Sequence, residues 1–247
     1  MIAPNFPDYS LTTKTGKFHH SARERTQYII DFLVSLTIKR IDILMVHSAG
    51  FFTAAMLTNN DQFTISKLIL LNPGVTYTLL KSPLVKYFAF NFRVFNAVYK
   101  NQRMRSFMEP VIKSMVSVGS NLSHFVLNDH NNVLLQASIS SYTNVDELVS
   151  AIDGLKEKLD NNNVKLLLVF SEKDELIPKD KFYSLVRKLG GSDENVEIYD
   201  IDDEIEKCRR KTSQPWVTVF RVGSHNFFMK NAVTVNTVIS KFIMSNN

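Results

Sequence analysis

The sequence predicts an α/β protein with a mostly parallel central sheet flanked by helices. Two apolar runs, 41–46 and 67–71, enclose a helical segment at 49–57. Runs of this kind are typical of parallel strands that are buried on both faces of a sheet. The strand–helix–strand order also implies a right-handed crossover between the two strands.

Ahead of this unit, the segment 21–37 is expected to form a helix. Its apolar residues recur at helical spacing. Ser21 precedes Glu24 by three residues, which is the spacing of a capping box and marks the start of the helix. Residues 2–6 resemble the end of a short strand, which Pro7 terminates.

The second half of the chain adds three strands to the predicted sheet. A strongly apolar strand at 164–170 is followed by a helix at 179–189. Two further strands are expected at 196–201 and 216–222, and a final amphipathic helix at 231–244. The alternation of strands and helices fits a sheet that is covered by helices on its faces.

The stretch between these two halves has a different character. Residues 77–159 are rich in Phe, Met and Asn and carry no clear strand pattern. We interpret this stretch as a helical lid or insertion over the edge of the sheet. The expected organisation is therefore one domain, 1–247, with a helical insertion at 77–159.

The charge pattern argues against a nucleic-acid partner. The net charge of +5 comes from 29 Lys and Arg against 24 Asp and Glu. The densest basic cluster lies within 207–211 and follows an acidic run within 202–206, so we interpret this region as a solvated loop of mixed charge. No recognised nucleic-acid-binding motif accompanies it.

The chain has the features expected of a cytoplasmic protein. Cys208 is the only cysteine, so no disulfide can form within the chain, which favours a reducing compartment. Residues 1–8 lack the basic and apolar regions of a signal peptide. No stretch reaches the roughly 18–20 continuous apolar residues of a transmembrane helix.

The most informative local pattern is the turn Val46-His47-Ser48-Ala49-Gly50 between a strand and a helix. A serine in such a sharp turn projects its hydroxyl above the carboxyl ends of the strands, and small residues two positions before and after it relieve crowding. Gly50 meets this requirement, whereas Val46 departs from it. Alternatively, Ser48 is only a helix N-cap, a role that serine favours.

A candidate acid follows the predicted strand 164–170. Asp174 falls in the turn before the next helix, where its carboxylate can reach the carboxyl edge of the sheet. Glu172 and Glu175 are rival acids, but the Asp-x-x-Ile-Pro string after an apolar strand favours Asp174. In the alternative interpretation, Asp174 is a surface carboxylate that caps the helix.

A candidate base lies near the end of the chain. His225 follows the strand 216–222 in the string Gly-Ser-His-Asn-Phe-Phe and precedes the last helix. Histidine side chains ordinarily titrate near neutral pH, which suits proton transfer from a serine. Alternatively, His225 is a loop histidine without a role. The other histidines receive no assignment, and no group of residues has the spacing of a metal site.

The order serine, acid, histidine on these elements resembles the α/β-hydrolase superfamily along nearly the whole chain. More narrowly, the chain resembles a nematode family of α/β-hydrolase-fold proteins of undetermined function. The strings that carry this resemblance are Asn5-Phe6-Pro7, His20-Ser21 with Glu24-Arg25, His47-Ser48-Ala49-Gly50, Asn72-Pro73-Gly74 and Gly223-Ser224-His225.

The resemblance implies a role for four residues. Ser48 would be the nucleophile, Asp174 the orienting acid, His225 the base, and Ala49 the donor of one oxyanion-hole N–H. It also implies that no cofactor is needed.

One departure from the superfamily concerns the start of the chain. Members normally begin with further strands and a His-Gly loop that supplies a second oxyanion donor, whereas this sequence opens at what resembles the fourth strand. In the superfamily's strand order, a missing third strand would leave two central edges unpaired, which is costly. We therefore expect either a shortened product of a longer gene or a rearranged sheet, and a lower activity.

The leading functional hypothesis is an esterase- or lipase-like serine hydrolase that acts on a small ester, thioester or amide. The Phe- and Met-rich insertion points to an apolar acyl group, although the same residues can form a packed core. Two alternatives stay open. The chain is a non-catalytic scaffold that keeps the fold for binding, or a shortened form that does not fold alone.

Overall fold

The chain forms two compact units, which are described separately. One comprises Met1–Phe32 and Ser82–Val145; the other, the sheet unit, comprises Leu33–Lys81 and Asp146–Asn247. The computed structural model describes residues 1–7, 18–74, 94, 101, 103–104, 106–107, 142, 144–193, 196–199, 205–208 and 215–245.

The sheet unit contains all the described strands. The described elements are, in chain order, α1 (Ala22–Ser35), β1 (Arg40–His47), α2 (Gly50–Thr58), β2 (Thr64–Leu71), α8 (Val145–Asp160), β3 (Lys165–Ser171), α9 (Lys179–Lys188), β4 (Val196–Tyr199), β5 (Ile205–Cys208), β6 (Trp216–Phe220), α10 (Phe227–Lys230) and α11 (Ala232–Met244). The strands form one sheet in the order β1-β2-β3-β6-β4-β5. All neighbours pair in parallel except β4 and β5, which are antiparallel. The predicted, mostly parallel sheet is confirmed.

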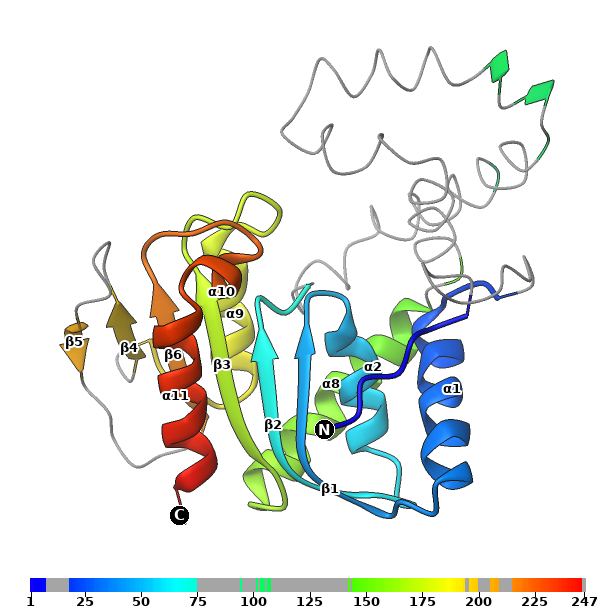
Figure 1. Cartoon of the computed structure of the whole chain (residues 1–247), viewed down its shortest axis with the longest axis horizontal. Helices are drawn as coiled ribbons and strands as arrows, with labels where there is room; N and C mark the ends of the chain where they lie inside the picture. Colours follow the sequence, from blue (N-terminus) through cyan, green and yellow to red (C-terminus); the bar gives the residue numbers. More distant parts are fainter. Residues whose placement is uncertain are drawn as a thin grey trace. The chain divides into compact units, whose positions relative to one another are not determined.

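Helices cover the sheet on both faces, as expected for a parallel sheet. In Figure 1, α11 lies in front of the sheet, and α2, α8 and α9 lie behind it. On the α11 side, Ile69, Leu167 and Phe220 pack with Phe242 of α11 in one buried cluster. On the opposite side, the ring of Phe170 stacks on Phe182 of α9, with ring centroids 4.8 Å apart.

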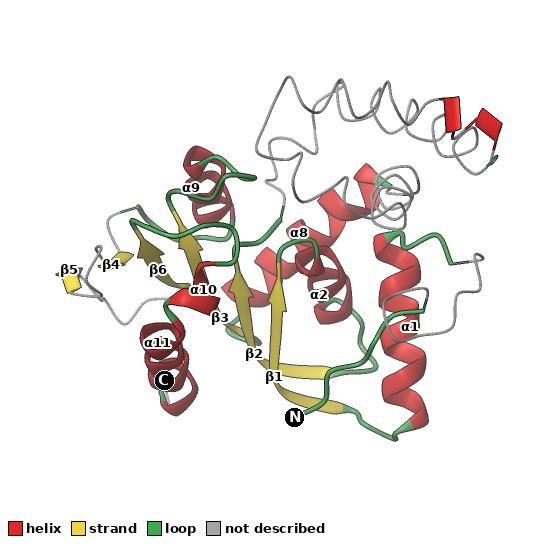
Figure 2. Ribbon diagram, turned by 45° about the horizontal axis from the view of Figure 1, so that its top comes forward, coloured by secondary structure: helices red, strands yellow, loops and turns green. Residues whose placement is uncertain are grey.

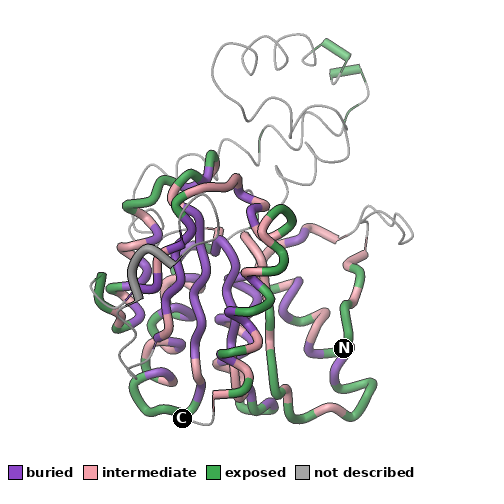
Figure 3. Tube along the Cα trace, turned by 60° about the vertical axis from the view of Figure 1, so that its left-hand side comes forward, coloured by how far each residue is buried: buried purple, intermediate pink, exposed green. Residues whose placement is uncertain are grey.

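The strands differ in how deeply they are buried. β3 is buried along nearly its whole length, and the strands at the centre of the sheet appear as continuous buried stretches in Figure 3. β1, in contrast, lies at the end of the described sheet with β2 as its one partner there. Ile43 and Met45 of β1 are 37% and 47% exposed. In the described sheet, the strand that leads to Ser48 is thus an edge strand rather than a central one.

Two local expectations were wrong. Residues 2–6 do not form a strand. Pro4 and Pro7 lack the N–H that a strand ladder requires, and the Asn5 carbonyl instead accepts a hydrogen bond from the Tyr28 hydroxyl at 2.9 Å. The region of mixed charge, expected to be only a loop, contains β5, which pairs with β4. Formation of an edge strand here depends on a neighbour that local sequence does not reveal.

The start of α1 agrees with the predicted capping box in one of its two bonds. The Ser21 hydroxyl accepts a hydrogen bond from the Glu24 N–H at 3.1 Å. The Glu24 carboxylate, however, accepts from the N–H of His19, at 2.7 Å, rather than from that of Ser21. Both interactions satisfy N–H groups that have no partner within the helix.

The predicted insertion at 77–159 falls mainly outside the described residues, and it stays a prediction, as does the single domain. Its last part, from residue 145, is described as the helix α8. Across the part of the chain that the structure describes, no helix has the length and apolarity needed to cross a membrane.

Candidate active site

Ser48 occupies a sharp turn between β1 and α2. Its φ of +52° lies in the left-handed region, which is costly for a residue with a side chain. Hydrogen bonds hold this conformation: the Ser48 N–H donates to the Leu71 carbonyl at 3.1 Å, and the Ser48 carbonyl accepts from Phe51 and Gly74 at 3.0 and 2.9 Å. The N-cap residue of α2 is Ala49, so the alternative role of Ser48 as a helix cap is not adopted.

The departure at Val46 is accommodated by its partner across the turn. A Cβ built on Gly50 would lie 3.3 Å from the Val46 Cβ, which is tighter than most such contacts. The two positions therefore share one limited space. The branched Val46 side chain fits because Gly50 has no side chain.

Asp174 is buried and has both carboxylate oxygens engaged. Its exposed fraction is 8%, and its Oδ1 accepts hydrogen bonds from the N–H groups of Leu176 and Ile177 at 2.8 and 3.0 Å. Its Oδ2 lies 2.7 Å from Nδ1 of His225. The residue before α9 is Pro178, so Asp174 is not the cap of that helix.

The two rival carboxylates have other partners. Glu172 accepts a hydrogen bond from the Tyr183 hydroxyl at 2.9 Å, and burial together with this carboxylate raises the pKa of the Tyr183 phenol. Glu175 accepts from the backbone N–H of His225 at 2.9 Å. Of the three acids, Asp174 is thus the one that bonds the imidazole.

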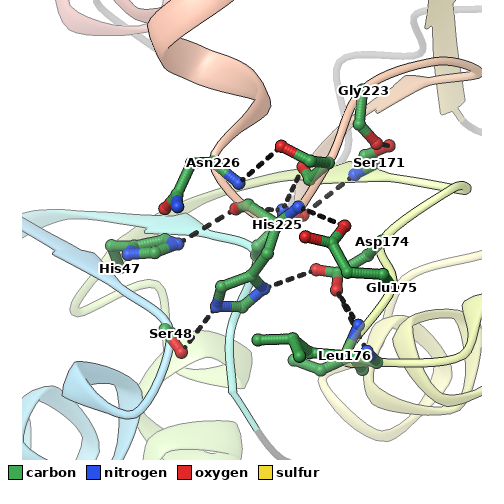
Figure 4. Close-up of polar contacts among 12 residues, drawn as sticks. His47, Ser48, Ser171, Asp174, Glu175, Leu176, Gly223, His225 and Asn226 are labelled. Carbon is green, nitrogen blue, oxygen red and sulfur yellow. Dashed lines mark hydrogen bonds and ion pairs between the residues drawn. The ribbon is translucent and has the colours of Figure 1, made fainter. Parts of the chain in front are cut away.

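His225 connects the serine and the acid (Figure 4). Its side chain is buried, and Nε2 lies 2.8 Å from the Ser48 Oγ. The Asp174 carboxylate bonded to the imidazole can only accept, so Nδ1 carries the proton. Nε2 is then free to accept the Ser48 hydroxyl proton. The structure brings together these three side chains from β1, β3 and β6, at the carboxyl ends of parallel strands.

A second histidine lies beside the first. His47 Nε2 donates to the His225 carbonyl at 3.2 Å, and the two rings are 4.7 Å apart between centroids. The other side of the His47 ring contacts Phe228. Burial lowers the pKa of His47, and the nearby His225 lowers it further, because two imidazolium charges at this separation repel each other.

The end of β2 also reaches this site. Asn72 is fully buried, with a φ of +39°. Its side chain donates to the His225 carbonyl at 2.7 Å and accepts from the Ser171 N–H at 2.9 Å. Ser171 in turn donates its hydroxyl proton to the Gly223 carbonyl at 2.6 Å.

Gly74 packs directly against the peptide that follows Ser48. A Cβ at Gly74 would lie 2.6 Å from the Ala49 nitrogen and 2.7 Å from the Ser48 carbonyl carbon, so no side chain fits there. The Ala49 N–H stands at the start of α2, where backbone N–H groups have no partner within the helix.

The sequence did not reveal the parts played by His47, Asn72, Gly74 and Glu175. The string Asn72-Pro73-Gly74 indicated only a turn. Its position directly after a buried parallel strand was a usable signal, because that strand ends at the same edge as the strands that carry Ser48 and Asp174. Among the described residues, no group of His, Cys, Asp and Glu is arranged to hold a metal ion.

Similar solved structures have the same fold. A putative aryl esterase from Burkholderia cenocepacia superposes with a TM-score of 0.54 at 15% identity, over 96% of this chain and 76% of that one. An esterase from Exiguobacterium antarcticum gives 0.53 at 15%, over 98% and 80%. A homoserine O-acetyltransferase from Staphylococcus aureus gives 0.53 at 16%, over 92% of this chain but 66% of that one. At these identities the likeness concerns the fold alone.

The sequence comparisons agree with the fold. No curated protein matches the sequence. The model of a family described as alpha/beta hydrolase of unknown function (DUF1057) matches residues 1–243. The predicted α/β-hydrolase fold is therefore confirmed, and the chain belongs to this family of α/β hydrolases of unknown function.

Proposed function

We propose that the protein is a serine hydrolase that cleaves a small ester, thioester or amide through an acyl-enzyme on Ser48. One observation carries the proposal. His225 lies between Ser48 and Asp174, with Nε2 2.8 Å from the serine oxygen and Nδ1 2.7 Å from the carboxylate. These distances support a serine that is activated by a base, which an acid in turn orients.

The first half of the reaction forms the acyl-enzyme. The Ser48 Oγ attacks the substrate carbonyl carbon while its proton passes to His225 Nε2. The carbonyl oxygen becomes an oxyanion, to which the Ala49 N–H donates. When the carbon–leaving-group bond breaks, the leaving group takes the proton from Nε2.

The second half returns the enzyme to its starting state. A water molecule loses a proton to His225 Nε2 and attacks the acyl carbon. The Ser48 Oγ then leaves with that proton, and a carboxylic acid is released. Throughout, the Asp174 carboxylate keeps the proton on Nδ1 and stabilises the imidazolium that forms twice in each cycle.

Backbone strain at Ser48 supports the proposal independently of the distances. A non-glycine residue at positive φ persists only where its surroundings hold it, and such residues gather at functional sites. Ser48 is held by hydrogen bonds to Leu71, Phe51 and Gly74, all of them through its backbone. The hydroxyl is consequently left to His225.

Labelling with a fluorophosphonate probe tests the proposal. The purified chain should be labelled at Ser48, and Ser48→Ala should remove all labelling. Asp174→Asn should slow labelling about 10⁴-fold, because the amide favours the wrong imidazole tautomer. Ser184→Ala, which removes a serine within α9, should label at the wild-type rate.

The alternative, a non-catalytic scaffold, is favoured by the position of β1. A nucleophile carried by an edge strand has support from one neighbouring strand in the described sheet. A wild-type chain that unfolds cooperatively yet shows no labelling would support the scaffold and overturn the hydrolase. Labelling of wild type that Ser48→Ala abolishes would support the hydrolase and overturn the scaffold.

A further inference from the structure

The backbone of His225 is held on both sides. Its carbonyl oxygen accepts hydrogen bonds from Asn72 Nδ2 at 2.7 Å and from His47 Nε2 at 3.2 Å. Its N–H donates to Glu175 at 2.9 Å. Glu175 is exposed, whereas Asn72 is completely buried. Since water competes with exposed polar contacts, the bond from Asn72 constrains His225 more firmly than the bond to Glu175.

The same amide group also reaches the strand that leads to the acid. Asn72 Oδ1 accepts from the Ser171 N–H at 2.9 Å, and Ser171 is the last residue of β3, three positions before Asp174. The backbone N–H of Asn72 donates to the Val169 carbonyl at 2.9 Å, which fixes the residue against β3. One side chain therefore joins the loop of the base to the strand end of the acid.

An amide fits this position, whereas an ionised carboxylate does not. The side chain must donate toward His225 and accept from Ser171, and a carboxylate can only accept. Asparagine also tolerates the φ of +39° better than most residues with a side chain. Glutamine is one methylene longer and would need space that a fully buried position lacks.

We infer that Asn72 is a positioning residue for the hydrolysis proposed above, on which this inference rests. It sets the place of the His225 backbone relative to β3, so that the imidazole stands between Ser48 and Asp174. Asn72 takes no part in bond making. Loss of the Asn72 side chain should displace His225, but His225 itself would still be present.

Asn72→Asp is the direct test. The introduced carboxylate still accepts from Ser171, but it faces the His225 carbonyl with a second oxygen and repels it. A misplacement of about 1 Å can cost about 10²-fold in rate, and we expect fluorophosphonate labelling to slow about 10- to 100-fold at pH near 8. The maximal rate of labelling should fall more than the probe concentration that gives half this rate rises, because the change displaces the base and does not alter the binding of the probe.

The pH profile separates positioning from a general loss of structure. A buried carboxyl group that faces a carbonyl has a raised pKa, and once protonated it can donate to the His225 carbonyl again. The deficit of Asn72→Asp relative to wild type should therefore shrink as the pH falls from about 8 toward about 5. A merely destabilised variant would show a deficit that stays constant or grows.

Asn59→Asp is the matched control. Asn59 follows the last residue of α2, at the opposite end of that helix from Ser48, and its Nδ2 donates to the Ala151 carbonyl at 2.8 Å. The same chemical change there should lower stability without changing the labelling rate of the folded protein. Should Asn72→Asp not fold, Asn72→Gly keeps the positive φ accessible and removes the side chain, and it should label slowly at every pH.

A second readout decides the inference even if wild type does not label. The proton between His225 Nδ1 and Asp174, 2.7 Å apart, should give a strongly deshielded NMR resonance, which its loss in Asp174→Asn would identify. The resonance should weaken in Asn72→Asp and persist in Asn59→Asp. Absence of labelling in wild type would end the hydrolase proposal alone. A resonance in Asn72→Asp as strong as that in Asn59→Asp would overturn the role of Asn72, whether or not wild type is labelled.

Discussion

The two halves of the site are built on different kinds of support. Asp174 and His225, the proposed acid and base, follow β3 and β6, which lie inside the sheet with neighbours on both sides. The serine follows β1, the terminal strand of the described sheet, whose side chains are largely exposed or half-buried. Two of the three residues therefore follow buried strands with two neighbours each, whereas the third follows a strand with one neighbour in the described sheet.

This difference raises the question of which contacts hold the three residues in place. The acid and the base are tied to one another through Asn72 and Ser171, all within the buried part. The serine is tied to them through β2, by the bond from its N–H to the Leu71 carbonyl and by the Gly74 contact. β2 and the turn after it therefore connect the two halves.

The largest expected effect is a loss of stability when a side chain of β2 is truncated to alanine, compared with an alanine substitution at its partner on β1. Ile69 and Met45 are partners in the parallel register, but Ile69 is fully buried and Met45 is 47% exposed. Ile69→Ala should cost about 2–5 kcal/mol in the free energy of unfolding, because a cavity is left. Met45→Ala should cost less than about 1 kcal/mol. Urea denaturation of both variants measures this.

This pair of variants also tests the exposure of β1. If Met45→Ala costs as much as Ile69→Ala, β1 is covered in solution, and the contrast between the two halves fails. Equal slopes of the two urea curves would show that the comparison concerns the same unfolding transition.

The second prediction concerns the contact that joins the halves. Gly74→Ala places a methyl group 2.6 Å from the Ala49 nitrogen, which is too close, so the Ser48–Ala49 peptide must move. Loss of one oxyanion donor costs about 10²–10³ in rate, and fluorophosphonate labelling should slow to that extent. Gly50→Ala instead meets the Val46 Cβ at 3.3 Å, a milder contact than the one at Gly74, and should slow labelling less. An order reversed between these two variants would contradict the role of Gly74.

Much of this arrangement was predictable from sequence because the strands occur in the sequence as apolar runs. β1, β2 and β3 were located within a few residues of their observed ends, and Ser48, Asp174 and His225 lie after β1, β3 and β6 respectively. Patterns of this type reflect local burial and chain order, and both are visible in one sequence.

Features that depend on partners distant in sequence were not predictable in the same way. Asn72 lies 153 residues from His225, and its string indicated only a turn. β5 is a four-residue strand within a stretch of mixed charge, and it forms because β4 offers an edge. The apolar run of β1 gave no sign that its side chains are exposed, since the same pattern describes a strand buried on both faces.

A smaller effect is expected where β2 holds the last helix. Lys67 Nζ donates to the carbonyls of Phe242, Ile243 and Ser245, at the end of α11, where a positive charge is favourable. Lys67→Met should lower the free energy of unfolding by about 1 kcal/mol. Lys165 is its register partner on β3. Burial lowers the pKa of Lys67, and the charge of Lys165 lowers it further, so Lys165→Met should leave stability unchanged or raise it slightly. Equal losses would show that the three carbonyl contacts do not matter.

The smallest expected effect is a pH dependence of stability from His47, which lies where the serine half meets the base. Burial lowers the pKa of His47 in the folded state, so the unfolded chain binds this proton more readily. The stability contribution is complete above the unfolded pKa of about 6.5 and declines as the pH falls toward the folded value. His47→Gln keeps a donor for the His225 carbonyl but does not titrate, so its unfolding free energy should fall less steeply between about pH 6.5 and pH 5 than that of wild type. If the two proteins show the same dependence of unfolding free energy on pH, His47 is protonated as easily in the folded protein as in the unfolded chain. The surroundings of Ser48 would then be more open to water than the contacts of His47 with His225 and Phe228 indicate.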